Sequence, residues 1–429
     1  MRIKPGCSHY DAIIVGARCA GASTAMLLAR AGLRVLALDR RAYGSDTLST
    51  HALMRPAVLQ LSRWGLLRRL LGAGTPLITA TAFHYGDEEI TIPLRATPQL
   101  PGLIAPRRTL LDRTLVDAAR EAGAEVLHDT VVADLVSSAD GRMRGVQILT
   151  SDGAHLTVTA DIVIGADGIG SLVAKRCGAQ TLRRGQVSAA HLYAYVPVEP
   201  ESSYHWYFRE GVSGSFIPTN DGLACIVASV PTKQFDERFR GGHEDARMAT
   251  LHALSPELAA QAGKATRGRI HVFRGAPGFL RQAHGPGWAL VGDAGFFRDP
   301  ITSHGISDAL RDSESLACAI LDNTAKAFEV YQRERDLISG QILDATDAIA
   351  SFNWTLLDIE DRHRQFSSVM KAEIVQLSQR DMPGCRAAGR GWQTTTALTL
   401  ASQGSSNRRE AADATRNRSN YANETLLCK

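Results

Sequence analysis

The spacing of apolar and polar positions divides the chain into segments with strand or helix periodicity. Near the start, the short apolar run 10–15 predicts a buried strand, and the Ala- and Leu-rich segment 22–31 predicts a helix that ends at Gly32. A second short apolar run, 33–38, predicts another strand. This order of strand, helix and strand predicts a βαβ unit, which begins a parallel sheet with helices on its faces.

The same kinds of pattern continue to about residue 185 and return later in the chain. Helical spacing occurs at 56–71, 107–122, 306–321 and 331–377. Strand-like runs occur at 79–93, 125–136, 146–149, 156–158, 161–165 and 288–291. Between residues 186 and 275 the pattern changes to alternating and aromatic, as in 191–196, 204–208, 214–218 and 223–228. Successive short strands with turn residues between them predict an antiparallel sheet, which could form the floor of a cavity.

We therefore predict an α/β fold in which a Rossmann-like domain with a mixed or parallel sheet is interrupted by an antiparallel-sheet substrate domain. The expected parts are 8–185 with part of the substrate region at 72–105, the antiparallel domain 186–275, a return to the first domain at 276–325, and C-terminal helices at 326–378. Residues 379–429 are rich in Gly, Ser, Asn, Arg and Thr without periodicity, so we expect a disordered tail. A substrate-facing or dimer-forming extension is the alternative.

Composition narrows the class of protein. The chain has 429 residues, 44% of them apolar, and a net charge of +4 that forms no dominant basic block. This argues against a nucleic-acid surface, whereas a mildly positive protein would attract a phosphorylated cofactor such as NADPH. The seven cysteines form no C-x-x-C pair and no metal-binding spacing, so we expect no metal and a reduced, cytoplasmic protein. No signal peptide and no apolar run of about eighteen residues is evident, so no membrane span is expected.

Three glycine-containing motifs carry the candidate chemistry. The first lies between the first strand and helix and reads Gly16-Ala17-Arg18-Cys19-Ala20-Gly21. A glycine turn there places backbone N–H groups and the positive end of a helix dipole against a pyrophosphate. Asp39, at the end of the second strand, lies where a βαβ dinucleotide fold places a carboxylate for a ribose hydroxyl.

The other two motifs also follow predicted strands. The second is Gly165-Ala166-Asp167-Gly168, and the third is Gly292-Asp293-Ala294 followed by Pro300, Gly305 and Ile306 at the start of a helix. In order and spacing, the three motifs suit a chain that wraps an FAD from its adenine end to its isoalloxazine ring. The third would set Asp293 near the ribityl hydroxyls, Pro300 against the ring, and the N–H groups of Gly305 and Ile306 near the flavin N1 and C2 carbonyl, where a helix N-terminus stabilises negative charge.

With Arg107-Arg108-Thr109-Leu110-Leu111-Asp112 opening a helix between the first two motifs, residues 8–378 resemble the single-component FAD-dependent monooxygenases of the para-hydroxybenzoate hydroxylase type and their superfamily. That superfamily includes geranylgeranyl reductase-like and halogenase-like relatives. The resemblance implies that the first motif holds the pyrophosphate, through Gly16, Arg18, Cys19, Ala20 and Gly21. It also implies that Asp39 and Arg40 lie at the adenosine ribose, Val132 at the adenine through its backbone, Arg108 at the phosphates or ribityl chain, and Asp167 and Gly168 at the pyrophosphate, with the nicotinamide cofactor as an open alternative for Asp167.

The chain also departs from the family pattern. Arg18 replaces the middle glycine of the first motif, Gly295-Phe296-Phe297 replaces a common Ala-His, and His304 precedes Gly305 where Gln or Gly is frequent. The tryptophans of the halogenase Trp-x-Trp-x-Ile-Pro run have no counterpart in 213–218, which disfavours halogenation.

The resemblance implies an NADPH- or NADH-dependent monooxygenase that hydroxylates or epoxidises an electron-rich aromatic or polyketide-like molecule with O2, through a flavin C4a-hydroperoxide. His51, His304 and Pro300 are the candidate active-site residues, although a hydrogen-bonded structural histidine is the alternative for the first two. A C=C reductase on the same scaffold and a flavin-binding protein without turnover remain alternatives. We expect a monomer or homodimer.

Overall fold

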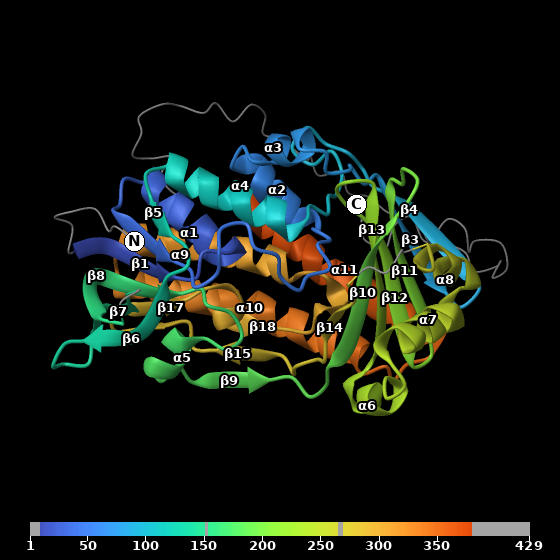
Figure 1. Ribbon diagram of the computed structural model, residues 1–429. Coiled ribbons are helices and arrows are strands. Elements are labelled where there is room, and N and C mark those ends of the chain that lie inside the picture. The colour runs from blue at the N-terminus through green and yellow to red at the C-terminus, as the bar shows by residue number, and fades with distance from the viewer. Residues whose placement is uncertain (1–8, 151–152, 265–268, 380–429) are drawn as a thin grey trace, which may run out of the picture.

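The computed structural model describes residues 9–150, 153–264 and 269–379. The prediction of a disordered tail falls on residues that, apart from 379, lie outside these ranges. Figure 1 shows the first sheet at the left, the second sheet at the right, and three long C-terminal helices running between them. The fold class expected from the sequence is confirmed.

The first sheet of the described chain has eight strands and contains the glycine motifs at its strand ends. Strands β2, β1, β8 and β17 run parallel, and β8 continues into an antiparallel meander with β7 and β6. The strands are β1 (His9–Val15), β2 (Val35–Leu38), β5 (Glu125–Leu127), β6 (Val131–Ser137), β7 (Met143–Leu149), β8 (His155–Gly165), β16 (His284–Gly285) and β17 (Trp288–Leu290). Because β1, β8 and β17 are parallel neighbours, their carboxyl ends, each followed by a glycine motif, meet at one edge.

Both faces of this sheet are buried, as the continuous apolar runs predict. Alternate residues of β1, such as Ala12 and Ile14, pack with helices α1, α4 and α9, whereas Ile13 and Val15 pack against the β6–β8 meander and α5 (Figure 1). The helices on this part of the molecule are α1 (Cys19–Arg30), α2 (Arg55–Arg63), α3 (Leu67–Gly72), α4 (Arg108–Glu121), α5 (Leu172–Arg176) and α9 (Gly305–Asp322).

The segment predicted as one helix at 56–71 forms two. Gly65 adopts φ +78° directly after α2, and its N–H donates to the carbonyl of Ser62 at 3.0 Å. The N–H of Leu66 donates to the carbonyl of Leu61 at 2.8 Å, which completes a Schellman end. Apolar spacing continues through Gly65, so periodicity alone could not reveal this break. Conversely, 156–158 and 161–165 join into the single strand β8.

The second sheet has seven strands within the described residues and is mainly antiparallel. Its strands are β3 (Ala80–Tyr85), β4 (Glu88–Pro93), β10 (Ala189–Pro197), β11 (Ser203–Arg209), β12 (Val212–Pro218), β13 (Leu223–Pro231) and β14 (His271–Phe273). The outer face is covered by α6 (Phe235–Arg238), α7 (His243–Leu254) and α8 (Pro256–Ala262), with the short 3-10 helix η1 (Thr232–Gln234) beside them (Figure 1). The inner face, with Tyr193, Tyr204 and Trp206, joins the core of the first domain. The domain boundaries remain a prediction.

Where the chain returns to the first domain, it contributes to a three-stranded sheet and forms two short 3-10 turns. The sheet joins β9 (Thr181–Arg184), β15 (Phe279–Arg281) and β18 (Phe296–Phe297), and the 3-10 turns are η2 (Gly292–Ala294) and η3 (Pro300–Thr302). The chain then forms α9, α10 (Ala325–Ala350) and α11 (Leu356–Gln379), which connect the two large sheets (Figure 1). Among the helices of the described ranges, none is both long and apolar enough to cross a lipid bilayer.

Candidate functional site

The first glycine motif brings β1, α1 and the turn after β8 into close contact. Gly16 adopts φ +99°, and a Cβ atom there would lie 2.3 Å from the carbonyl oxygen of Ala166. A Cβ atom on Gly21 would lie 1.8 Å from the carbonyl oxygen of Gly16. Only glycine fits either position. The first and second motifs are therefore packed against each other, and Cys19, Ala20 and Gly21 form the first turn of α1.

Asp39 lies at the end of β2 and is 7% exposed. Its carboxylate accepts hydrogen bonds from the N–H groups of Ala17 and Arg41, each at 2.8 Å. Each carboxylate oxygen retains a lone pair for a further donor. A hollow of about 230 Å³ opens beside it, lined by Ala17, Arg18, Asp39, Arg41, Ala42, Gly44, Ser45, Asp112, Val116 and His128. Arg40 is exposed next to this hollow.

Arg18, the departure from the family motif, turns toward α4 and the loop after β2. Its guanidinium donates to Asp112 at 3.1 Å and to the hydroxyl of Ser45 at 3.3 Å. Asp112 also accepts from Arg108 at 3.0 Å and from the thiol of Cys19 at 3.2 Å. Asp112 thus holds two arginines beside the helix N-terminus. The sequence analysis did not assign it a role, although its position four residues after Arg108 is a signal for an ion pair.

Two expected cofactor residues of the first sheet have structural partners. Asp167 accepts from the hydroxyl of Ser171 at 2.5 Å and from the N–H of Leu172 at 2.6 Å, so its carboxylate caps α5. Val132 pairs with Ile148 across β6 and β7. Gly168 has φ +78° with open space around its Cα.

Asp293, in η2, has an incompletely satisfied carboxylate. Burial raises its pKa to about 6, while the charge of Arg108 acts in the opposite direction. Within the described residues, no hydrogen bond to the Asp293 carboxylate is found. A desolvated carboxylate of this kind gains from hydroxyl donors.

The N-terminus of α9 is also unsatisfied. In the described chain, no backbone acceptor takes the N–H groups of Gly305 or Ile306, and the buried hydroxyl of Ser307 has no partner. An eighteen-residue helix presents a positive dipole end at this point. The arrangement suits a group that accepts hydrogen bonds and carries negative charge.

The loop that leads into α9 is anchored to the second sheet by Asp299. This fully buried carboxylate accepts from the N–H of Ala189 at 2.6 Å, from His191 at 3.0 Å and from the N–H of Ile301 at 3.0 Å. Pro300 is therefore held in η3 at a fixed place relative to β10. Asp299 could not be assigned this role from the sequence, because the two partners in β10, Ala189 and His191, lie more than a hundred residues away.

His51 lies in the loop opposite and is 1% exposed. Its Nε2 atom hydrogen-bonds the hydroxyl of Tyr195, and its buried Nδ1 atom has no partner among the described residues. Burial, together with the charges of Arg108 and Arg107, holds the pKa of His51 well below its usual range. His51 is consequently a neutral imidazole near pH 7.

The loop of His51 also touches the loop of Pro300. The hydroxyls of Thr50 and Ser303 are 3.2 Å apart, and the N–H of Ser49 donates to the hydroxyl of Tyr193 at 3.1 Å. Arg107 covers the Tyr195 ring, with its guanidinium carbon 3.7 Å from the ring centre. The loop that contains residues 49–51 and the loop that contains Ser303 therefore meet beside the second sheet.

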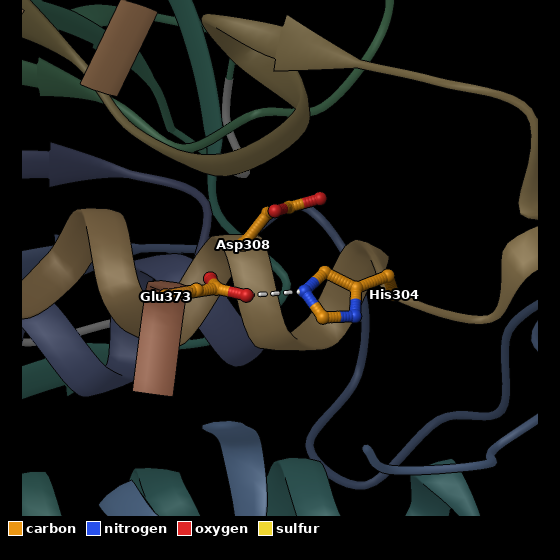
Figure 2. Close-up of side chains that lie close together, drawn as sticks. All are labelled: His304, Asp308 and Glu373. Carbon is orange, nitrogen blue, oxygen red and sulfur yellow. Dashed lines mark hydrogen bonds and ion pairs between the residues drawn. The ribbon is translucent and has the colours of Figure 1, made fainter. Parts of the chain in front are cut away.

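His304, which directly precedes α9, lies in a buried ionic network. Its Nε2 atom is 2.6 Å from Glu373 of α11, and Arg311 donates to both Glu373 and Asp308 at 2.9 Å. Figure 2 shows the Glu373 carboxylate facing the His304 ring, with Asp308 nearby. Their potential metal-binding atoms lie within 4.8 Å of one another, but the guanidiniums of Arg298 and Arg311 already occupy the carboxylates. We therefore regard this cluster as an ionic network. Glu373 could not be identified from the sequence, because α11 shows only amphipathic spacing.

These features fit an FAD in one extended position. Asp39 and its neighbouring hollow suit the adenosine end, the start of α1 suits the pyrophosphate, Asp293 suits the ribityl hydroxyls, and the unsatisfied N–H groups of α9 suit the flavin carbonyl. The carboxyl ends of β1, β8 and β17 bring these positions to one edge of the first sheet.

Comparisons with known proteins agree with this geometry. Residues 9–346 match the model of the FAD binding domain family. Digeranylgeranylglycerophospholipid reductase 2 of Methanothermobacter thermautotrophicus is 27% identical over 308 residues, covering 69% of this chain and 74% of the relative. Aklavinone 12-hydroxylase of Streptomyces peucetius is 25% identical over 371 residues, covering 79% and 74% respectively.

Among solved structures, a myxobacterial chondrochloren halogenase superposes with a TM-score of 0.71 at 23% identity, covering 88% of this chain and 92% of the halogenase. This likeness concerns the fold alone, and the expectation against halogenation remains a prediction. The family model covers most of the 429 residues. The chain therefore belongs to the FAD-binding domain family, within the para-hydroxybenzoate hydroxylase-like superfamily of FAD-dependent oxidoreductases.

Proposed function

We propose that this oxidoreductase is an NAD(P)H-dependent monooxygenase that hydroxylates or epoxidises an electron-rich small molecule. The balanced reaction consumes substrate, O2, NAD(P)H and a proton, and yields the oxygenated product, NAD(P)+ and water. When bound, FAD supplies the redox chemistry by accepting a hydride and delivering electrons to oxygen.

The observation that carries this proposal is the buried junction between the loops of His51 and Pro300, which we call the enclosed site. His51 is buried, Thr50 contacts Ser303, and Asp299 fixes the loop of Pro300 against β10. Transfer of oxygen to a substrate requires a site from which water is excluded, since water diverts reactive oxygen species to peroxide. In this proposal, the contacts between the loops keep water from the substrate on this side.

The residues of the chain have separate roles in this proposal. The α9 N-terminus stabilises negative charge on the reduced cofactor. His51 is neutral, and its Nδ1 atom has no partner among the described residues, so it accepts a hydrogen bond from a substrate hydroxyl while Tyr195 orients its ring from Nε2. Arg107 and Tyr195 form a polar and aromatic wall beside it. The other site residues bind and orient the cofactor, as assigned above.

Purified holoprotein tests the proposal directly. NAD(P)H oxidation should accelerate in the presence of a phenolic or polyketide-like aromatic substrate, and isotopically labelled O2 should leave one labelled oxygen atom in the product. A product that gains two hydrogens and no label would contradict monooxygenation.

A product that gains two hydrogens and no labelled oxygen would support a C=C reductase, the alternative function. Its support is the sequence similarity to the archaeal digeranylgeranylglycerophospholipid reductases, which covers most of both chains. Anaerobic turnover with the same reductant separates the two, because a monooxygenase has no product without O2.

A further inference from the structure

A second hollow lies away from the glycine motifs, between the start of α2, the inner face of the second sheet and α11. Its space of about 500 Å³ includes the part that is open to solvent, so it is a partly open hollow. We name it the α2–α11 cavity; it is lined by Met54, Arg55, Pro56, Thr81, Leu94, Leu103, Tyr204, Trp206, Ser367, Met370, Lys371 and Ile374.

Most of the lining is apolar; Thr81, Tyr204 and Ser367 add hydroxyl groups, and the charged members are two cations. Arg55 and Lys371 are both partly buried, and no acidic side chain lines the cavity within the described chain. Among the residues that the structure describes, the guanidinium of Arg55 donates only to the carbonyl of Arg95, at a long 3.4 Å. Across the described ranges, neither cation is in an ion pair. Charges that are partly removed from water without a counter-ion favour binding of an anion.

The position of Arg55 strengthens this argument. It is the first residue of α2, a nine-residue helix with no acidic residue in its first turn. A helix N-terminus favours negative charge, so a cation there is unfavourable. An anion between Arg55 and Lys371 would be stabilised by both side chains and by the helix dipole.

The cavity shares one sheet face with the loops around His51. Tyr193, Val227, Ser215 and Trp206 are opposite one another across β10, β13, β12 and β11, so their side chains lie on the same face. Three strand spacings separate Tyr193 from Trp206, about 14 Å. Tyr193 accepts a hydrogen bond from Ser49 in the loop of His51. The inner face thus extends from the enclosed site to the cavity.

We propose that the α2–α11 cavity binds the apolar body of an elongated ligand whose anionic end, a carboxylate or a phosphate monoester, lies between Arg55 and Lys371. If that ligand is the substrate, the inference rests on the proposed function, and the substrate of the monooxygenase is an amphiphilic anion. The reacting end would then lie near His51, about 14 Å along the sheet.

Binding of decanoate, decyl phosphate and uncharged decan-1-ol to the holoprotein tests the proposal, followed by calorimetry and by the fluorescence of Trp206, which lines the cavity. Both anions should bind at least about tenfold more tightly than the alcohol. Equal affinity of the alcohol, or no binding of any probe, would overturn the proposal. Stronger binding of decyl phosphate than of decanoate would favour a phosphate headgroup, and the reverse a carboxylate; both support the shared anion site.

Variants locate the binding. The double variant Arg55→Gln and Lys371→Gln should reduce anion affinity about tenfold or more and leave decan-1-ol unchanged. Met370→Trp should weaken all three probes by filling the cavity. Arg68→Gln, which removes an exposed cation on α3, is the matched control and should change nothing. Retained anion preference in the double variant would refute the assignment, and that variant should fold because both side chains are partly exposed.

The binding measurements need neither O2 nor NAD(P)H. Failure of the proposed monooxygenase reaction therefore leaves their result intact. Conversely, absence of probe binding would refute the cavity assignment while substrate-stimulated NAD(P)H oxidation remained observable.

Discussion

The ionic network around Glu373 gives the sharpest prediction about how the C-terminal helix supports the cofactor site. Replacing Glu373 by Gln keeps the side-chain size and removes one negative charge. Glu373 is fully buried, accepts from Arg311 at 2.9 Å and lies 2.6 Å from His304, the residue that precedes α9. The substitution therefore loosens the contact between α11 and the N-terminus of α9.

The expected cost follows from burial and charge. Although burial opposes ionisation, His304 and Arg311 hold the pKa of Glu373 below its usual range, so the carboxylate is ionised at neutral pH. Removing one member of a buried ion pair leaves its partners uncompensated and costs about 3–5 kcal/mol. The amide retains a hydrogen-bond acceptor, so we expect about 3 kcal/mol, the lower end of that range.

Urea unfolding, followed by fluorescence and circular dichroism, measures this loss. The matched control is Glu121→Gln, because Glu121 pairs with Arg69 at 2.7 Å on the surface, where the two side chains are 55% and 48% exposed. An exposed pair contributes less than about 1 kcal/mol. We also expect weaker FAD binding for Glu373→Gln only. Equal loss of stability in the two variants would refute the buried-network argument.

Further predictions concern the cofactor site and pH. Burial raises the pKa of Asp293 to about 6, and ribityl hydroxyls would favour its charged form. The FAD affinity of the wild type should therefore rise about tenfold between pH 5 and 7.5. Fluorescence titrations of Asp293→Asn should show no such pH dependence. Gly16→Ala should abolish FAD binding or folding, since its Cβ would lie 2.3 Å from a carbonyl oxygen, whereas Gly72→Ala, with open space around it, should retain the wild-type absorbance spectrum. His51→Ala should lower the ratio of product to NAD(P)H consumed and raise peroxide release, while an unchanged ratio would exclude a role for His51 in the enclosed site. Burial lowers the pKa of His363 to about 3, so below pH 6.5 the unfolded chain gains a proton that the folded chain does not. Between pH 6.5 and 5 this difference should lower the free energy of unfolding by about 2 kcal/mol. The His363→Gln variant should not show this loss of stability.

The sequence was sufficient for the parts of the fold that rest on local patterns. The βαβ beginning and the antiparallel sheet follow from apolar runs and turns, and the glycines at 16 and 21 require the close approach that the structure has. The break at Gly65 was missed because the apolar spacing continues through it, although a glycine is itself a signal for a helix end, as at Gly32.

The site was harder to predict where long-range partners decide the role of a residue. His304 has a polar side chain in a motif position, yet it pairs with Glu373 from α11, 69 residues away. Asp299 acts through Ala189 and His191, which no spacing connects to it. Such contacts are set by tertiary packing, and a single sequence carries no record of them.

The central claim is that the three glycine motifs, Asp39 and Asp293 bind one FAD along a single edge of the first sheet. The most direct measurement is the stoichiometry and affinity of FAD on the purified chain, determined by flavin absorbance and by titration of the cofactor-free protein. The account predicts one FAD per chain, bound more weakly by both Asp39→Ala and Asp293→Ala. A folded chain that binds no FAD, or binds it equally well in both variants, would contradict it.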